Sequence, residues 1–132
     1  MRSINLLYEE DNYMSKIMQF YSSWRNMDIP LWLKTDTYAN NKTLAIRAVL
    51  AEDLEDMGSR GEPYAMLTVN LPGGDAAGNR QYVDTNNWHG AEELIRRYGL
   101  GKFTGKYGGY GFCEYPLYEF DMNRIAEFLY ED

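Results

Sequence analysis

Leu31-Trp-Leu-Lys-Thr-Asp-Thr-Tyr38 and Leu44-Ala-Ile-Arg-Ala-Val-Leu50 carry the clearest structural signal in this chain. In the first segment Leu and Thr alternate with Trp, Lys, Asp and Tyr, and in the second every other residue is aliphatic. A period of two places successive side chains on opposite faces of a β-strand. Asn40 and Asn41 lie between the segments and are typical of a turn. The pattern therefore predicts two strands joined by a turn.

Three further segments have strand character. Residues 64–71 are rich in β-branched and aromatic types, and shorter strands are expected at Gln81–Thr85 and Pro116–Phe120. The charged segment Ala51–Glu62 and the Pro/Gly-rich segment 72–78 are expected to be loops. Together these segments predict an antiparallel sheet of four to five strands.

Helical spacing appears near both ends of the chain and once between them. Apolar residues recur at this spacing from Met14 to Trp24, and Pro30 closes that segment. A second helix is expected to begin after Asn86 or Asn87 and to end at Gly99. A third helix is expected to begin after Asp121, its N-cap. Its core-facing residues are Met122, Ile125, Phe128 and Leu129.

Length and composition indicate one folded domain that spans residues 1–132. The chain is 45% hydrophobic and 25% charged, which is ordinary for a globular protein, and two halves of 132 residues would each be too small for an adequate core. We therefore expect an α+β fold in which the antiparallel sheet carries about three helices. Residues 31–132 are expected to form the α+β core, and residues 1–30 an N-terminal helical segment that is a candidate for an added specificity element.

The single cysteine and the single histidine narrow the possible chemistry. A structural zinc site takes four Cys or His ligands, and Cys113 with His89 supplies two at most, so neither a metal nor another cofactor is expected. One cysteine cannot form an internal disulfide, which favours a reduced, cytoplasmic location. The apolar runs are far shorter than the roughly 20 residues that span a bilayer, so no membrane partner is expected.

The charge of the chain favours a basic protein as its partner. The formal net charge is −7, with 13 Lys and Arg against 20 Asp and Glu, and this charge disfavours direct binding to nucleic acid. Acids concentrate in Ala51–Glu62 and again in Glu114–Asp132, and the 12 tyrosines suit an interface. The candidate partner-binding residues are Tyr21, Trp24, Glu52, Asp53, Glu55, Asp56, Glu127, Glu131 and Asp132.

Three alternatives remain open from the residues alone. The segment Gly108–Tyr115 fits the aromatic strand motif of RNA-recognition domains except at Gly108 and Cys113, which predicts stacking of single-stranded RNA on Tyr110 and Phe112. The glycines of residues 99–111 do not have the spacing of a phosphate-binding loop, and a mobile or tightly turned loop is expected there. A homodimer built on the first helix is another possibility.

A cysteine enzyme is the third alternative. Cys113 and His89 could form a thiolate and imidazolium pair, with Asp84, Asn86 or Asn87 orienting the ring. Neither a nucleophile elbow nor a known cysteine signature surrounds these residues. A cysteine between aromatic residues is more often a small apolar core residue, so a non-enzymatic role is favoured.

Three strings of residues resemble a known family. They are Glu62–Leu71, Tyr82–Asn87 and Gly111–Asp121, and the likeness extends over roughly residues 31–132. The chain is similar to an uncharacterised group of small proteins encoded by plasmids, conjugative elements and phages of Gram-positive gut bacteria. The resemblance implies an accessory gene of a mobile element, among which acidic inhibitors of restriction or CRISPR nucleases are a familiar class. The leading hypothesis is thus an acidic, anti-defence inhibitor that occupies the nucleic-acid-binding surface of a host nuclease.

Overall fold

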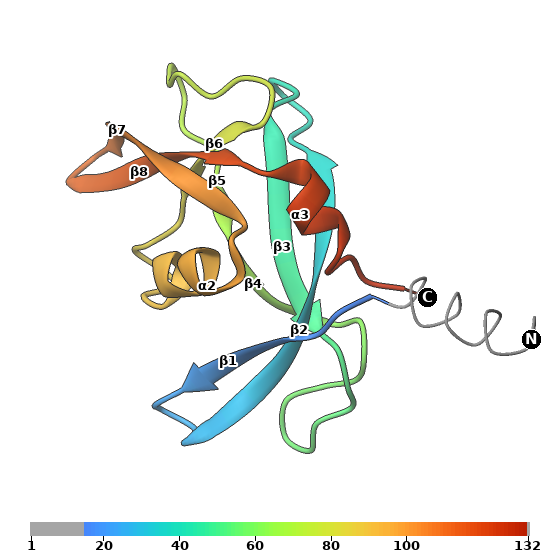
Figure 1. Ribbon diagram of the computed structural model, residues 1–132. Coiled ribbons are helices and arrows are strands. Elements are labelled where there is room, and N and C mark those ends of the chain that lie inside the picture. Colours follow the sequence, from blue (N-terminus) through green and yellow to red (C-terminus); the bar gives the residue numbers. More distant parts are fainter. Residues whose placement is uncertain (1–14, 132) are drawn as a thin grey trace, which may run out of the picture.

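The computed structural model describes residues 15–131, and within them the chain is mainly β-structure (Figure 1). Eight strands form two antiparallel sheets of four strands each. The first sheet has the order β1-β2-β3-β4, from β1 (Met18–Ser22), β2 (Met27–Thr37), β3 (Leu44–Leu50) and β4 (Pro63–Met66). The second has the order β5-β6-β8-β7, from β5 (Thr68–Val69), β6 (Arg80–Val83), β8 (Cys113–Phe120) and β7 (Gly101–Tyr110).

The expected α+β fold, with one sheet and about three helices, is therefore wrong. Residues 15–131 hold two helices, α2 (Ala91–Tyr98) and the short α3 (Met122–Ala126), beside the two sheets. The strands expected at 31–38, 44–50, 64–71, 81–85 and 116–120 all exist, although the third is divided into β4 and β5. The expectation failed because two further strands, β1 and β7, occupy segments that were assigned to a helix and to a loop.

The described part of the expected N-terminal helix is a β-hairpin. Met18 and Ser22 are buried whereas Gln19 and Tyr21 are exposed, so burial alternates with the period of a strand. Asn26 adopts a left-handed backbone conformation (φ 55°), which asparagine tolerates better than most residues, and it helps to turn the chain into β2. Pro30 lies inside β2, opposite Gln19 of β1, instead of ending the segment.

The two sheets are joined at Leu67, where one extended segment passes from the first sheet into the second. The Leu67 amide donates to the carbonyl of Ile46 in β3 (2.9 Å), and the Leu67 carbonyl accepts from the amide of Asp84, just after β6 (2.9 Å). Thr68 reinforces this corner because its hydroxyl accepts from the Ile46 amide (3.0 Å). In Figure 1 the strands of the two sheets run in crossing directions. The main core lies between them and includes Leu33, Ile46, Leu67, Val83, Ile95 and Phe120.

α2 begins later than expected. Its N-cap is Gly90, which provides no side-chain cap, so the expected caps at Asn86 and Asn87 are wrong. The Asp84 carboxylate instead accepts from the amide (3.2 Å) and side chain (2.9 Å) of Asn87, which organises the turn before the helix. The expected end at Gly99 is confirmed, since this residue has the left-handed conformation of a C-cap (φ 65°).

The glycine-rich segment that was expected to be a loop is β7, an edge strand. Its pairing with β8 is interrupted by an irregularity between Phe103 and Tyr107. Two of its glycines are required by close approach, because a Cβ atom on Gly101 would lie 2.9 Å from the Glu119 carbonyl and one on Gly108 would lie 2.5 Å from the Tyr82 ring. Such glycines weaken the propensity signal of a strand while they make its packing possible.

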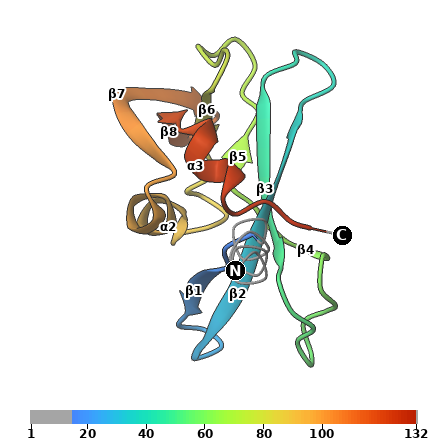
Figure 2. The same ribbon diagram turned by 45° about the vertical axis from the view of Figure 1, so that its right-hand side comes forward.

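The C-terminal segment completes the first sheet. Asp121 caps α3 as expected, with its carboxylate accepting from the Arg124 amide (3.0 Å), but the helix ends at Ala126. The following residues run beside β2, where the Leu33 amide donates to Phe128 (2.8 Å) and the Tyr130 amide donates to Leu33 (2.8 Å). Figure 2 shows this segment crossing in front of β2 and β3.

Candidate functional site

The loop between β3 and β4 displays four carboxylates to solvent. Its base is closed by hydrogen bonds from Gly61 to Leu50 (2.7 Å) and from Leu50 to Glu62 (2.9 Å). The four acidic side chains are exposed, and none of them forms an ion pair with another residue of the described chain. They are Glu52, Asp53, Glu55 and Asp56.

Arg60 ties this acidic loop to the body of the protein. Its amide donates to the Asp53 carboxylate (2.8 Å), and its guanidinium lies over the rings of Trp32 (4.7 Å) and Tyr130 (5.4 Å). The same guanidinium donates to the backbone carbonyl of Glu131 (2.6 Å). These contacts hold the loop in one position and bring Glu131 beside it.

The β1–β2 hairpin tip extends from the same end of the first sheet as the acidic loop. Leu31 pairs with Leu50, so β2 continues past the end of β3 as far as Met27, and Figures 1 and 2 both show the two features at this end. At the tip Trp24 is 86% exposed and Tyr21 is 51% exposed. We call this surface the acidic end, defined by Tyr21, Trp24, Glu52, Asp53, Glu55, Asp56 and Glu131.

Glu127 differs from the loop acids because its carboxylate forms ion pairs with two basic side chains. Its carboxylate accepts from Lys16 (2.7 Å) and Arg124 (3.0 Å). The hydrogen bond from Lys16, together with the charges of both cations, lowers the pKa of Glu127 below its ordinary value. This carboxylate therefore joins the N-terminal and C-terminal segments. Asp132, the last of the expected partner-binding residues, lies outside the described residues.

The thiol and imidazole pair of the cysteine-enzyme alternative is not assembled among residues 15–131. Cys113 is half-buried near the β7–β8 turn and packs against a small cluster with Tyr82, Tyr115 and Leu117. His89 is exposed in the turn before α2, and no hydrogen bond joins it to Cys113 within the described chain. The environment of Cys113 is that of an apolar packing residue.

The segment that fits the RNA-recognition motif does not lie on one strand. Its glycine and aromatic residues are divided between the end of β7, a turn at Gly111 and Phe112, and the start of β8. Phe112 is fully exposed in that turn, and Tyr110 is exposed beside it. Sequence reasoning missed two further exposed rings of β7, Phe103 and Tyr107, because the surrounding glycines hide the alternation of a strand.

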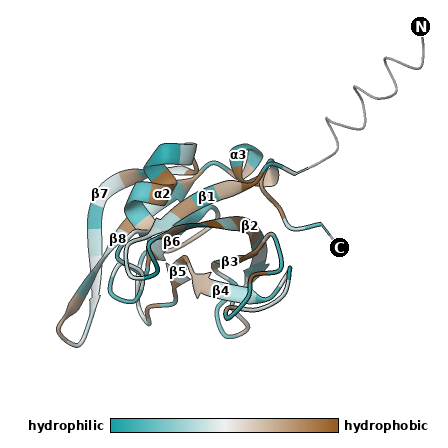
Figure 3. Cartoon of the chain, turned by 90° about the horizontal axis from the view of Figure 1, so that it is seen from below, coloured by the Kyte–Doolittle hydropathy of each residue, from teal (hydrophilic) through white to brown (hydrophobic). Residues whose placement is uncertain are grey.

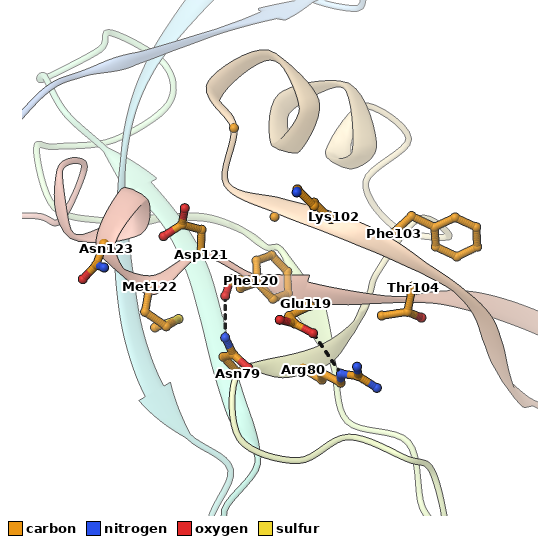
Figure 4. A pocket seen from close by; sticks show the side chains of 12 residues that line it. Asn79, Arg80, Lys102, Phe103, Thr104, Glu119, Phe120, Asp121, Met122 and Asn123 are labelled. Atoms are coloured by element: carbon orange, nitrogen blue, oxygen red, sulfur yellow. Dashed lines mark hydrogen bonds and ion pairs between the residues drawn. The ribbon is translucent and has the colours of Figure 1, made fainter.

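A groove of about 680 Å³ lies at the opposite end of the β7–β8 pair (Figure 4). Arg80, Glu119 and Lys102 form a row of alternating charge across β6, β8 and β7, in which Arg80 donates to Glu119 (3.2 Å). Figure 4 shows Asp121 at one side of this row and Phe103 at the margin of the groove. The neighbouring charges largely balance, so the groove has no strong preference for an ion of either sign.

Comparison with known proteins places the chain in a family. Residues 32–132 match a family that is described as a domain of unknown function, DUF4313. The chain belongs to the DUF4313 family. The acidic loop, both helices and the second sheet lie within the DUF4313 region, whereas Tyr21 and Trp24 precede it.

The match confirms that the chain belongs to an uncharacterised family, as the three sequence strings indicated. No curated protein and no solved structure matches this DUF4313 chain. Within residues 15–131, no helix has the length and apolar character needed to cross a membrane.

Proposed function

We propose that this DUF4313 protein is a non-enzymatic interaction protein whose acidic end docks on a basic surface of another protein. The observation that carries the proposal is the position of an exposed tryptophan, Trp24, at the same end of the sheet as four carboxylates that form no ion pair with the described residues. Tryptophan is enriched among residues that dominate binding energy at interfaces, and clustered charge accelerates association with a partner of opposite sign.

The proposed partner is a cytoplasmic nucleic-acid-binding enzyme, most concretely a host defence nuclease. Carboxylates held on a fixed loop present negative charge to the lysines and arginines that otherwise bind phosphates. The resemblance to small proteins of plasmids, conjugative elements and phages supports an anti-defence role, as an anti-restriction or anti-CRISPR inhibitor. In this account the protein excludes nucleic acid from its partner and catalyses no reaction.

Affinity capture with the full chain tests the proposal. The tagged protein is incubated with lysate of a Gram-positive gut bacterium in low and high salt, beside the triple variant Glu52→Gln/Glu55→Gln/Asp56→Asn. Asp53 is retained because it bonds Arg60. A matched control, Asp75→Asn/Glu93→Gln/Glu114→Gln, removes the same amount of charge from exposed acids of other segments.

The expected result is salt-sensitive capture of a basic nucleic-acid enzyme that the loop variant loses and the control variant keeps. Trp24→Ala is expected to weaken the same capture at both salt concentrations, because it removes an apolar anchor. Recovery of no basic nucleic-acid enzyme, or equal loss in both triple variants, would count against the proposal.

A further inference from the structure

Arg60 is a cation inside the surface that is proposed to meet a basic partner. The segment Ala51–Glu62 holds five acids, and Arg60 is its only basic residue. The Arg60 guanidinium forms no ion pair with a carboxylate of residues 15–131. This side chain therefore does not neutralise the loop acids, and on charge alone it would weaken the attraction of a basic partner.

The guanidinium instead lies against two aromatic rings that contact each other. The rings of Trp32 and Tyr130 are 5.6 Å apart between centroids, and Arg60 lies 4.7 Å from the first and 5.4 Å from the second. The guanidinium also donates to the backbone carbonyl of Glu131 (2.6 Å). A planar guanidinium can stack on rings while its edge donates hydrogen bonds, which a lysine ammonium cannot do. We call Trp32, Arg60 and Tyr130 the Arg60 stack.

The two rings of the Arg60 stack are fixed by the first sheet. Trp32 is 8% exposed and packs in a buried cluster with Val49 and Ala51. Its indole N–H is buried and has no hydrogen-bond partner among the described residues, so Trp32 contributes to this surface through its ring and not through its polar atom. Tyr130 is held because its amide donates to a carbonyl of β2 (2.8 Å). The guanidinium thus lies on a rigid base.

The backbone around Arg60 connects the stack to the acids. The Arg60 amide donates to the Asp53 carboxylate (2.8 Å). A Cβ atom on the next residue, Gly61, would lie 2.6 Å from the Tyr130 hydroxyl oxygen, so the Tyr130 ring packs directly on the loop backbone. The position of the carboxylates in residues 52–56 is therefore coupled to the position of the rings.

The Arg60 stack lies within the DUF4313 region. Trp32, Arg60 and Tyr130 all fall in the matched residues 32–132, whereas Trp24 precedes them. Seen from below in Figure 3, the C-terminal segment passes from hydrophobic to hydrophilic colour as it leaves α3 and reaches this end of the molecule. The loop acids and the side chains that support them thus belong to the same domain.

We infer that Arg60 is a positioning residue of the acidic end, whose contacts with Trp32 and Tyr130 hold the loop carboxylates where a basic partner meets them. The inference rests on the proposed docking function and adds a sign to it. Removal of this positive charge weakens the binding of a positively charged partner, although it makes the surface more negative. A loop that is ordered beforehand loses less freedom on binding, and this gain exceeds the small repulsion from one exposed cation.

Hydrogen exchange on the full chain without a partner tests the positioning. In Arg60→Gln, the amides of residue 60 and Leu54, both bonded within the loop, are expected to exchange about 5- to 30-fold faster, the factor for loss of two exposed cation–aromatic contacts. Tyr130→Leu removes one such contact without a change of charge, and an increase of about 2- to 5-fold is expected. Tyr130→Phe keeps the ring and is expected to exchange like the wild type.

Fluorescence anisotropy with a short labelled lysine-rich peptide tests the sign. The wild type is expected to bind at low salt, and Arg60→Gln to bind at least about twofold more weakly. Tyr130→Leu is expected to bind more weakly than Tyr130→Phe, although the two carry the same charge. The matched control is Arg47→Gln, which removes the same charge from an exposed position of β3 and is expected to bind the peptide at least as tightly as the wild type.

An affinity of Arg60→Gln that equals or exceeds that of the wild type would overturn the inference, as would unchanged exchange of the loop amides in that variant. In both cases, binding of the peptide by the wild type leaves the proposed docking function standing. A wild type that does not bind the peptide at low salt contradicts the docking function itself, and with it the role of Arg60 in docking, whatever the exchange rates show.

Discussion

The Tyr82 ring packs between Gly74 and Gly108, and neither glycine leaves room for a Cβ atom. The position of the β7–β8 hairpin therefore depends on the absence of a side chain at these two residues. A Cβ atom on Gly108 would lie 2.5 Å from the Tyr82 ring, and one on Gly74 would lie 2.6 Å from the same ring. The Tyr82 hydroxyl also accepts from the Asp75 amide (2.9 Å). The ring is buried and fixed on both sides, so it cannot move aside at low cost.

Gly108→Ala is therefore expected to lower the free energy of unfolding by about 1–3 kcal/mol, the usual cost of overpacking a core. Urea denaturation followed by circular dichroism measures the change. Gly109→Ala is the matched control in the same strand, since its Cβ would meet only the Cys113 carbonyl at 3.3 Å. The packing of Tyr82 against Gly108 would be contradicted if Gly108→Ala left the free energy of unfolding unchanged, or lowered it less than Gly109→Ala does.

Two helix caps were predictable from the sequence, whereas the start of α2 was not. Gly99 was predicted as a C-cap and Asp121 as an N-cap, because both positions have strong local preferences. The start of α2 was not predictable in the same way. Asn86 and Asn87 have the chemistry of caps, but Asp84 uses Asn87 to form a turn, and the helix begins beyond both asparagines at Ala91.

α3 is a short element whose stability depends on its cap. Five residues form too little helix to persist alone, and the Asp121 carboxylate satisfies the Arg124 amide at its start. α3 also positions the segment that pairs with Leu33 of β2. Loss of the cap should consequently affect the edge of the first sheet.

Asp121→Ala is expected to cost about 1 kcal/mol of stability, while Asp121→Asn should retain most of it, because asparagine is an equally good cap. Thermal or urea unfolding of the two variants provides the comparison. Hydrogen exchange at the Leu33 and Tyr130 amides is expected to increase in the alanine variant alone. Equal behaviour of both variants would show that the carboxylate has no capping role.

Strands with clear alternation were predictable, and strands without it were not. β3 was expected at its observed bounds, and the sequence alternation from Leu31 to Thr37 located the second half of β2, which begins four residues earlier, at Met27. β1 was missed because Met14, Ile17, Met18 and Tyr21 also satisfy a helical spacing, although Met18, Phe20 and Ser22 carry the inward face of a strand. β7 was missed because its four glycines, at positions 101, 105, 108 and 109, suppress both propensity and alternation.

The arrangement of two sheets depends on contacts between distant residues, which local patterns do not record. The corner at Leu67 exists because its two backbone groups bond to Ile46 and Asp84, and neither partner is marked in the sequence.

The acidic end also depends on contacts that local sequence patterns do not record. The loop acids were recognised from composition, but only the fold brings Glu131 to the loop through Arg60 and leaves Glu127 engaged by Lys16.

Taken as a whole, the chain distributes its charge unevenly along its length. The acidic loop contributes a charge of −4 from five acids and Arg60, and residues 96–106 contribute +4. A protein of net charge −7 that spread its acids evenly would repel anions everywhere. The uneven distribution concentrates negative charge at the acidic loop, the surface proposed to attract a basic protein.

Amide chemical shifts of the full chain during titration with a short lysine-rich peptide test the docking surface most directly. We expect the signals of residues 52–56 and Glu131, with the indole signal of Trp24, to shift together and those of residues 103–112 to stay unchanged. Shifts spread over the exposed acids of the whole molecule, including Asp75, Glu93 and Glu114, would contradict the existence of an acidic docking end.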